Sequence, residues 1–211
     1  DVGVVEVGRA LGLSPEPGHE RRVGGELGEQ DLDGHRPVEQ PVTSQVDRLV
    51  EGSSLEVVRT PASLAELTKA AAQDGVIFAG AVGGGYVFPE FLPAYDATAS
   101  LCKLLELLAP VDRKLSELVA ELPVSHVVHR QVPCPWAQKG LVMRVLTERL
   151  KDRDVDLQDG IKIYDERGWA QVLPDPDEPL VHVYAEGESE EVSAELEQEL
   201  RSLVEDVLQN G

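Results

Sequence analysis

The feature that most restricts the fold is the stretch of residues 76–91, which reads VIFAGAVGGGYVFPEF. Residues 76–78 are a short apolar run of the β-branched and aromatic kind that favours a buried strand. Three glycines at 83–85 interrupt the run before residues 86–88 resume it. Consecutive glycines permit positive φ angles and the close approach of another group. The stretch therefore predicts either an ordinary hairpin connection or a loop that surrounds a ligand.

Around this stretch, helix-like and strand-like segments alternate from residue 41 to residue 124, which favours a layered α/β unit. Ser63 and Glu66 have the spacing of a capping box, and Asp96 is the expected N-cap of a longer helix that follows. The sequence predicts strands at 55–58, 76–78 and 86–88 and helices at about 44–50, 63–73, 97–108 and 115–122.

The remainder, residues 125–211, has a different order of elements. It predicts a strand at 125–132, a helix at 136–151, strands at 160–164, 169–173 and 180–185, and a helix at 190–208. Residues 165–168, which read DERG, are typical of a hairpin turn between the first two strands of that triplet. This order favours a second, α+β domain built on an antiparallel sheet.

Residues 1–40 differ from both units, because they are rich in Gly, Glu and Arg and show almost no apolar periodicity. We interpret them as a poorly ordered or remnant segment, with a truncated or misread reading frame as an alternative. Within the string DLDGHR at 31–36, Asp31 and Asp33 are weak candidates for Mg²⁺ ligands, since Mg²⁺ prefers carboxylate oxygens. A polar loop contains such a string by chance often enough that a metal site is not the leading interpretation.

Composition restricts the class of protein. The chain has 211 residues, 42% of them hydrophobic, and a formal net charge of −20, which argues against binding to nucleic acid or to an anionic membrane surface. It shows neither an apolar run of membrane-spanning length nor a signal peptide at its start. Cys102 and Cys134 do not suggest a disulfide framework or a metal knuckle. Cytoplasm is the expected location.

Three histidines, at 126, 129 and 182, raise the question of a metal site. His126 and His129 are three residues apart on one predicted strand, so they point to opposite faces and cannot ligate one ion from that strand. No cysteine lies beside them, and the sequence does not show which residue would be close in space. We therefore interpret all three as ordinary strand residues.

Several motifs carry a resemblance to a known family. Segments DGIKI, GWAQV and EPLVHVYAE, at 159–163, 168–172 and 178–186, resemble the C-terminal domain of the α-D-phosphohexomutases, the phosphomannomutases and phosphoglucomutases. Residues 76–93, followed by Asp96 and by LSEL at 115–118, resemble that family's third domain, an α/β/α unit. The segment PCPW at 133–136, with QKG at 138–140 and MR at 143–144, is similar to the mutase-like region fused behind a sugar nucleotidyltransferase. Such fusions occur in bacterial proteins of the mannose-1-phosphate guanylyltransferase type.

The resemblance implies an intramolecular phosphotransfer on hexose phosphates, carried out by four domains around one cleft. The first domain bears a phosphorylated serine, the second holds Mg²⁺, the third binds sugar hydroxyls and the fourth binds phosphate. The sequence offers no candidate for the serine loop, so no catalytic residue is assigned. The string at 31–36 resembles the metal loop but has His35 where the family usually has an acid. Mg²⁺ is therefore expected only if the family activity is retained.

Both remaining ligand loops depart from the family pattern. In the sugar loop, residues 80–85, Ala81 stands where the family has Glu, Gly83 where it has Ser and Gly85 where it has His, with Gly80 and Gly84 as the flanking glycines. The phosphate loop usually reads RPSGTEP. Here it reads LPDPDEP, with Leu173, Pro174, Asp175, Pro176 and Asp177 in the first five positions.

These replacements predict that neither loop retains its ligand. Phosphate capture needs backbone N–H groups, hydroxyls and a cation, whereas this loop offers a leucine, two prolines and two acids. The resulting hypothesis is a mutase-like module that is not catalytic alone and serves structure, regulation or assembly beside a sugar nucleotidyltransferase or through self-association. The alternative is part of a phosphohexomutase that binds hexose phosphate once missing domains complete it.

Overall fold

The computed structural model describes residues 34–39, 41–51, 55–122 and 124–210. The chain divides into two compact units, residues 1–123 and 124–211. Within the described residues, no helix is both long and apolar enough to cross a membrane.

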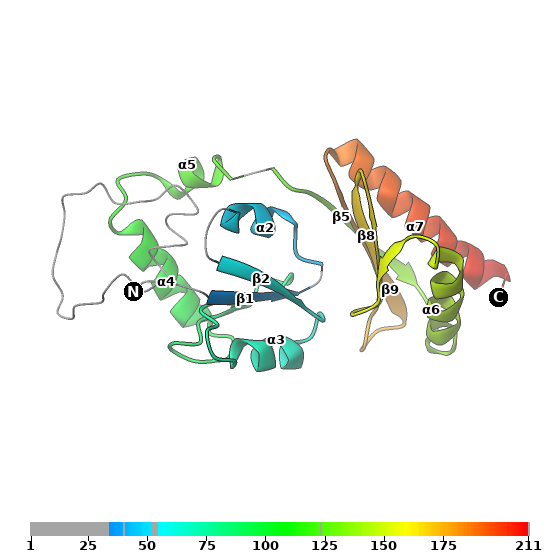
Figure 1. The fold of residues 1–211 in the computed structure, drawn as a ribbon, viewed down its shortest axis with the longest axis horizontal. Helices are drawn as coiled ribbons and strands as arrows, with labels where there is room; N and C mark the ends of the chain where they lie inside the picture. The colour runs from blue at the N-terminus through cyan, green and yellow to red at the C-terminus, as the bar shows by residue number, and fades with distance from the viewer. Residues whose placement is uncertain (1–33, 40, 52–54, 123, 211) are drawn as a thin grey trace. The chain divides into compact units, whose positions relative to one another are not determined.

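The first unit is built on a four-stranded sheet in the order β2-β1-β3-β4. β1 (Gly34–Glu39) runs parallel to both β2 (Leu55–Thr60) and β3 (Ala79–Gly80), and β4 (Tyr86–Val87) pairs antiparallel with β3. Figure 1 shows α2 (Gln45–Val50) and α3 (Leu64–Ala71) on opposite sides of β1 and β2. The predicted α/β/α layering is confirmed.

Two further helices, α4 (Ala97–Leu108) and α5 (Leu115–Val119), follow this sheet. The prediction for Asp96 is confirmed, because its carboxylate accepts the N–H of Ala99 at 2.8 Å and caps α4. The capping box predicted for α3 is wrong: Ser63 is the N-cap residue, but its side chain makes no capping hydrogen bond. Its backbone carbonyl accepts from Leu67 at 2.9 Å instead.

Two sequence predictions for this unit need correction. Residues 34–39, GHRPVE, were placed in the poorly ordered segment, yet they form the strand that pairs with both β2 and β3. A polar sequence with a proline gives no local strand signal, so pairing on both sides determines its conformation. The strand predicted at residues 76–78 lies instead at Ala79–Gly80, where Ala79 joins the small core with Leu67, Ala71 and Val87.

The second unit is an antiparallel five-stranded sheet in the order β5-β9-β8-β7-β6. Its elements are β5 (His126–Pro133), α6 (Trp136–Leu150), β6 (Asp154–Asp156), β7 (Ile161–Asp165), β8 (Gly168–Pro174), β9 (Leu180–Gly187) and α7 (Glu190–Asn210). Every predicted element is present, and only the three-residue β6 was not predicted. The hairpin turn is confirmed as well, since Asp165 pairs with Gly168.

Both helices of this unit, α6 and α7, cover the same face of the sheet (Figure 1). The core forms between them, because inward-facing strand residues such as Val172 and Val183 pack against a stripe on α7 that includes Leu200 and Val204. Alternation along each strand then places the intervening residues on the other face. His129, His182 and Tyr184 share that second face, next to the connection between β8 and β9.

Candidate functional site

Of the sugar-loop positions, Gly80 is the last residue of β3, and the others lie on the tight β3–β4 turn, residues 81–85. The turn is closed by two backbone hydrogen bonds, from Ala81 N–H to the carbonyl of Gly85 at 2.9 Å and from Gly84 N–H to that of Ala81 at 3.1 Å. Gly84 has a φ of +90°, a conformation that L side chains rarely adopt. The backbone hydrogen bonds and this glycine together define a tight turn.

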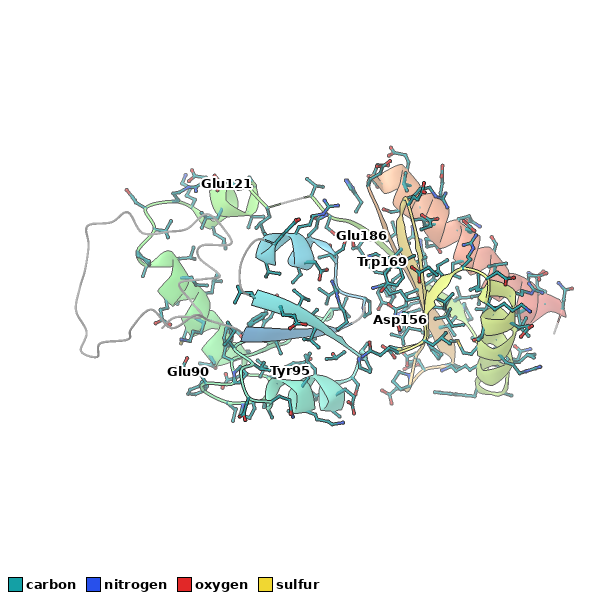
Figure 2. All side chains as sticks on the ribbon, in the orientation of Figure 1. Glu90, Tyr95, Glu121, Asp156, Trp169 and Glu186 are labelled. Carbon is teal, nitrogen blue, oxygen red and sulfur yellow. The ribbon has the colours of Figure 1, made fainter. Side chains whose placement is uncertain are left out.

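The same turn carries no polar side chain, since its residues read AVGGG. A Cβ at Gly85 would come within 2.6 Å of the ring of Tyr95, whereas one at Gly83 would meet nothing within 4 Å. The ring of Tyr95, labelled in Figure 2, thus takes the space of a side chain at position 85. Without donors or acceptors on its side chains, the turn offers a sugar only backbone groups.

The phosphate-loop positions meet at the end of β8 and in the β8–β9 loop, residues 175–179. Leu173 and Pro174 are the last residues of β8. In the loop, one carboxylate oxygen of Asp175, Oδ1, accepts the backbone N–H groups of Asp177 at 2.7 Å and Glu178 at 2.6 Å. Both backbone N–H groups are therefore bonded to the loop's own aspartate.

The second oxygen of this carboxylate is also engaged. Asp175 Oδ2 lies 2.8 Å from His182 Nε2, a ring nitrogen that donates when it carries a proton. The hydrogen bond from His182, followed by those from the two backbone N–H groups, holds the pKa of Asp175 below its usual range. The carboxylate is thus ionised, and both of its oxygens are used within the second unit.

Lys139 of α6 forms hydrogen bonds with the backbone of the same loop. Only 8% of this residue is exposed. Its ammonium donates to the backbone carbonyl of Asp175 at 2.5 Å and to that of Glu178, and it lies 3.7 Å from the ring centre of Trp136. The buried ammonium of Lys139 is therefore hydrogen-bonded to backbone carbonyls of the loop. The sequence had marked Lys139 only as part of a family motif.

A histidine pair extends the interactions of Asp175 across the sheet. His129 Nε2 lies 2.9 Å from His182 Nδ1, and the His129 ring stacks on Tyr184 with centres 4.3 Å apart. The sequence interpretation treated these histidines as ordinary strand residues. Their closeness depends on the β5–β9 register, in which His129 pairs with Tyr184. A single sequence carries no direct signal of that register.

A second polar cluster lies on the same unit. Trp169 donates its indole N–H to Glu186 at 2.8 Å, and Ser125 donates its hydroxyl to the other carboxylate oxygen at 3.1 Å. Trp169 and Glu186 are labelled in Figure 2. The ammonium of Lys162 lies 4.0 Å from the Trp169 ring centre. These contacts join side chains of β7, β8 and β9 to Ser125, which precedes β5.

The first unit contains a cleft of about 530 Å³ between α4 and the segment before it. Phe78, Phe88 and Phe91 line it together with residues of α4 and with Glu90, which is labelled in Figure 2. Its charged α4 residues Lys103 and Glu106 pair with each other at 3.1 Å, and Asp96 is used as a helix cap. The cleft is mainly apolar and lacks the convergent polar groups of a sugar site.

Metal ligation gains no support from the described part of the chain, where no three His, Cys, Asp or Glu residues gather closely enough to hold an ion. The candidates Asp31 and Asp33 lie outside the described residues. Residues 34–36 of the same string belong to β1, so this string is not a loop throughout.

Comparisons with known proteins define the class. Residues 29–125 match the family model "Phosphoglucomutase/phosphomannomutase, alpha/beta/alpha domain III". A phosphoglucomutase/phosphomannomutase family protein of Burkholderia thailandensis has the same fold, with a TM-score of 0.71 at 18% identity over 84% of this chain and 38% of that one. The chain therefore has the fold of these structures, with a domain III-like α/β unit followed by an antiparallel-sheet unit.

Curated relatives lead to the same superfamily. A probable phosphoglucosamine mutase of Methanopyrus kandleri is 35% identical over 161 residues, 75% of this chain and 36% of that protein. A phosphoglucomutase/phosphomannomutase of Thermococcus kodakarensis is 28% identical over 152 residues, 71% of this chain and 33% of that protein. The chain is thus similar to proteins that are named as mutases. The chain spans about a third of the length of the curated relatives that it matches.

Proposed function

We propose that this chain is a phosphohexomutase-like module that does not bind sugar phosphates by itself and serves structure, regulation or assembly in sugar-phosphate metabolism. The observation that carries the proposal is the position of Asp175. Its carboxylate occupies the backbone N–H groups of Asp177 and Glu178, which an incoming phosphate would need. A phosphate would have to displace the carboxylate of Asp175, which is part of the loop itself.

Electrostatics support the same conclusion. The carboxylates of Asp175 and Asp177 would each oppose a phosphate by about 1 kcal/mol even in a well-hydrated site. Lys139, the nearest buried cation, is already bonded to two loop carbonyls. Leu173 supplies no charge where the resembling family has an arginine. The loop therefore combines a filled anion position with repulsion from its own acids.

Isothermal titration calorimetry with glucose 1-phosphate, mannose 1-phosphate and phosphoglucosamine tests this proposal. The natural chain should show no binding tighter than about 1 mM, which corresponds to about 4 kcal/mol. A variant with the family loop restored, Leu173→Arg/Asp175→Ser/Pro176→Gly/Asp177→Thr, should gain measurable affinity. The single variant Leu173→Arg is the matched control for added charge alone. Millimolar or tighter binding to the natural loop would overturn the proposal.

A second candidate function is part of an active phosphohexomutase that further domains complete. It is favoured by one observation, that the relatives matching this chain are named as mutases and that the matches cover only about a third of their length. The test is a coupled mutase assay, with Mg²⁺ and a hexose bisphosphate primer, on the longest natural protein that contains this sequence. Turnover would establish this function, and its absence would favour the non-catalytic module.

Association with a sugar nucleotidyltransferase, or with a second copy of the chain, belongs to the first proposal. It rests on the sequence resemblance at residues 133–144 rather than on a contact within the described residues. Light scattering after size exclusion measures the mass of the chain alone and with a purified sugar nucleotidyltransferase. A mass equal to that of the monomer in both samples would remove assembly from the proposal.

A further inference from the structure

The histidine pair of the second unit has a hydrogen-bonding pattern that determines where its protons lie. Asp175 is ionised and accepts from His182 Nε2, so that nitrogen carries a proton. In a neutral His182 ring, Nδ1 is then a bare acceptor. His129 Nε2, 2.9 Å away, must supply the proton between the two rings. The neutral pair is thereby restricted to one combination of tautomers.

One additional proton fits this arrangement. It binds either to His129 Nδ1, or to His182 Nδ1 while the proton of His129 moves from Nε2 to Nδ1. In both cases a single proton remains between the rings and the hydrogen bond is kept. A second additional proton places N–H groups on both facing nitrogens and two positive charges on adjacent rings, so the hydrogen bond is lost.

We propose that Asp175, His182 and His129 form a pH-responsive lock on the β8–β9 loop, which is tightest when the histidine pair holds one additional proton. In that state a positive charge on the pair strengthens the contact with the carboxylate that fastens Asp177 and Glu178. Gain of the second proton separates His129 from His182 and disturbs its stacking on Tyr184. The lock concerns how the loop is held and does not depend on whether the whole protein is catalytic.

The charged groups around the pair favour this behaviour. On the loop side lie Asp175, Asp177 and Glu178, and below the loop lies the ammonium of Lys139 from α6. On β5 the neighbouring cation is Arg130. Burial, then the charge of His182, then that of Arg130 lower the pKa of His129. These three effects oppose an additional proton on His129.

Nitrogen-15 NMR of the histidine rings between pH 4 and 9 tests the lock on the whole chain. We expect one tautomer for each ring at high pH, and two proton-uptake steps for the pair that differ by at least about tenfold in affinity, one pH unit. The loop amides of Asp177 and Glu178 should shift with the first step. His126 is the internal control, since it pairs opposite Gly187 at the far end of β5.

Two variants complete the experiment. His129→Gln removes one ring while leaving His182 beside Asp175, so a single step should remain that still moves the loop amides. His182→Gln should alter the titration of His129 and leave the His126 resonance at each pH unchanged. The proposal is overturned if the rings titrate in one overlapping step, if they show mixed tautomers, or if His182→Gln leaves His129 unaffected.

Discussion

The β3–β4 turn and the β8–β9 loop are the two segments at which this chain departs most from the ligand loops that it resembles, and they depart in opposite ways. The turn is a tight backbone turn with three glycines and no polar side chain. The loop instead binds its own side chain, because Asp175 accepts from backbone N–H groups of the loop and Lys139 donates to the loop's carbonyls. One segment therefore lacks polar side chains, and in the other a side chain of the loop bonds to the loop's own backbone.

The difference has energetic consequences. The β3–β4 turn has few side-chain contacts, so we expect substitutions there to affect stability only where space or backbone conformation is restricted. The β8–β9 loop should contribute to the stability of the second unit, because each of its hydrogen bonds satisfies a polar group that would otherwise need water. Trp136 and Trp169 both lie in the second unit, so tryptophan fluorescence reports unfolding of that unit alone.

The largest effect is expected from Lys139→Met. Methionine keeps the side-chain volume but cannot donate to the carbonyls of Asp175 and Glu178, and hydrogen bonds from charged groups are worth about 1.5–3 kcal/mol each. We expect a loss of about 3 kcal/mol in the free energy of unfolding, measured by urea denaturation followed by tryptophan fluorescence. Lys151→Met, at an exposed position near the end of the same helix, should change it by less than about 0.5 kcal/mol. Equal effects of the two substitutions would contradict the role given to Lys139.

The next effect is expected from Asp175→Asn, and it depends on pH. The pKa of Asp175 is lower in the folded chain than in the unfolded one, so its charge stabilises the fold fully above the unfolded pKa of about 3.9. That contribution is lost as the pH falls through the pKa that Asp175 has in the folded chain. The variant should be less stable by about 1–2 kcal/mol at neutral pH, a difference that shrinks at acidic pH. Urea denaturation at a series of pH values measures it, with Asp177→Asn as control.

Most elements of the second unit follow from its sequence, and so does the cap of α4 by Asp96. What the sequence could not reveal depends on contacts between distant segments. The polar strand at residues 34–39 is specified by pairing to β2 and β3, and the meeting of His129 with His182 depends on the β5–β9 register. The sequence predicted that Asp175 would repel phosphate. Only the structure shows that it binds the loop itself.

A smaller effect is expected at the β3–β4 turn from Gly85→Ala. The added Cβ would lie 2.6 Å from the Tyr95 ring, which must move. Since this ring is partly exposed, the cost should be near the low end of overpacking, about 1 kcal/mol. Protection of the Ala81 amide from hydrogen exchange measures it, because that N–H donates to residue 85. In the background of Tyr95→Ala the same substitution should cost almost nothing, and an unchanged cost would show that the ring is not the cause.

The smallest effect is expected from Gly83→Ser, and it separates the two loops most cleanly. A Cβ at Gly83 meets nothing within 4 Å, so the serine should change stability by less than about 0.5 kcal/mol. Gly84→Ser, one residue further, should cost about 1 kcal/mol, because the φ of +90° at that position disfavours any side chain. Hydrogen exchange at the Ala81 amide compares the two variants directly. If serine at position 83 costs as much stability as serine at position 84, the side-chain space at position 83 is not open. The contrast between the β3–β4 turn and the β8–β9 loop would then fail.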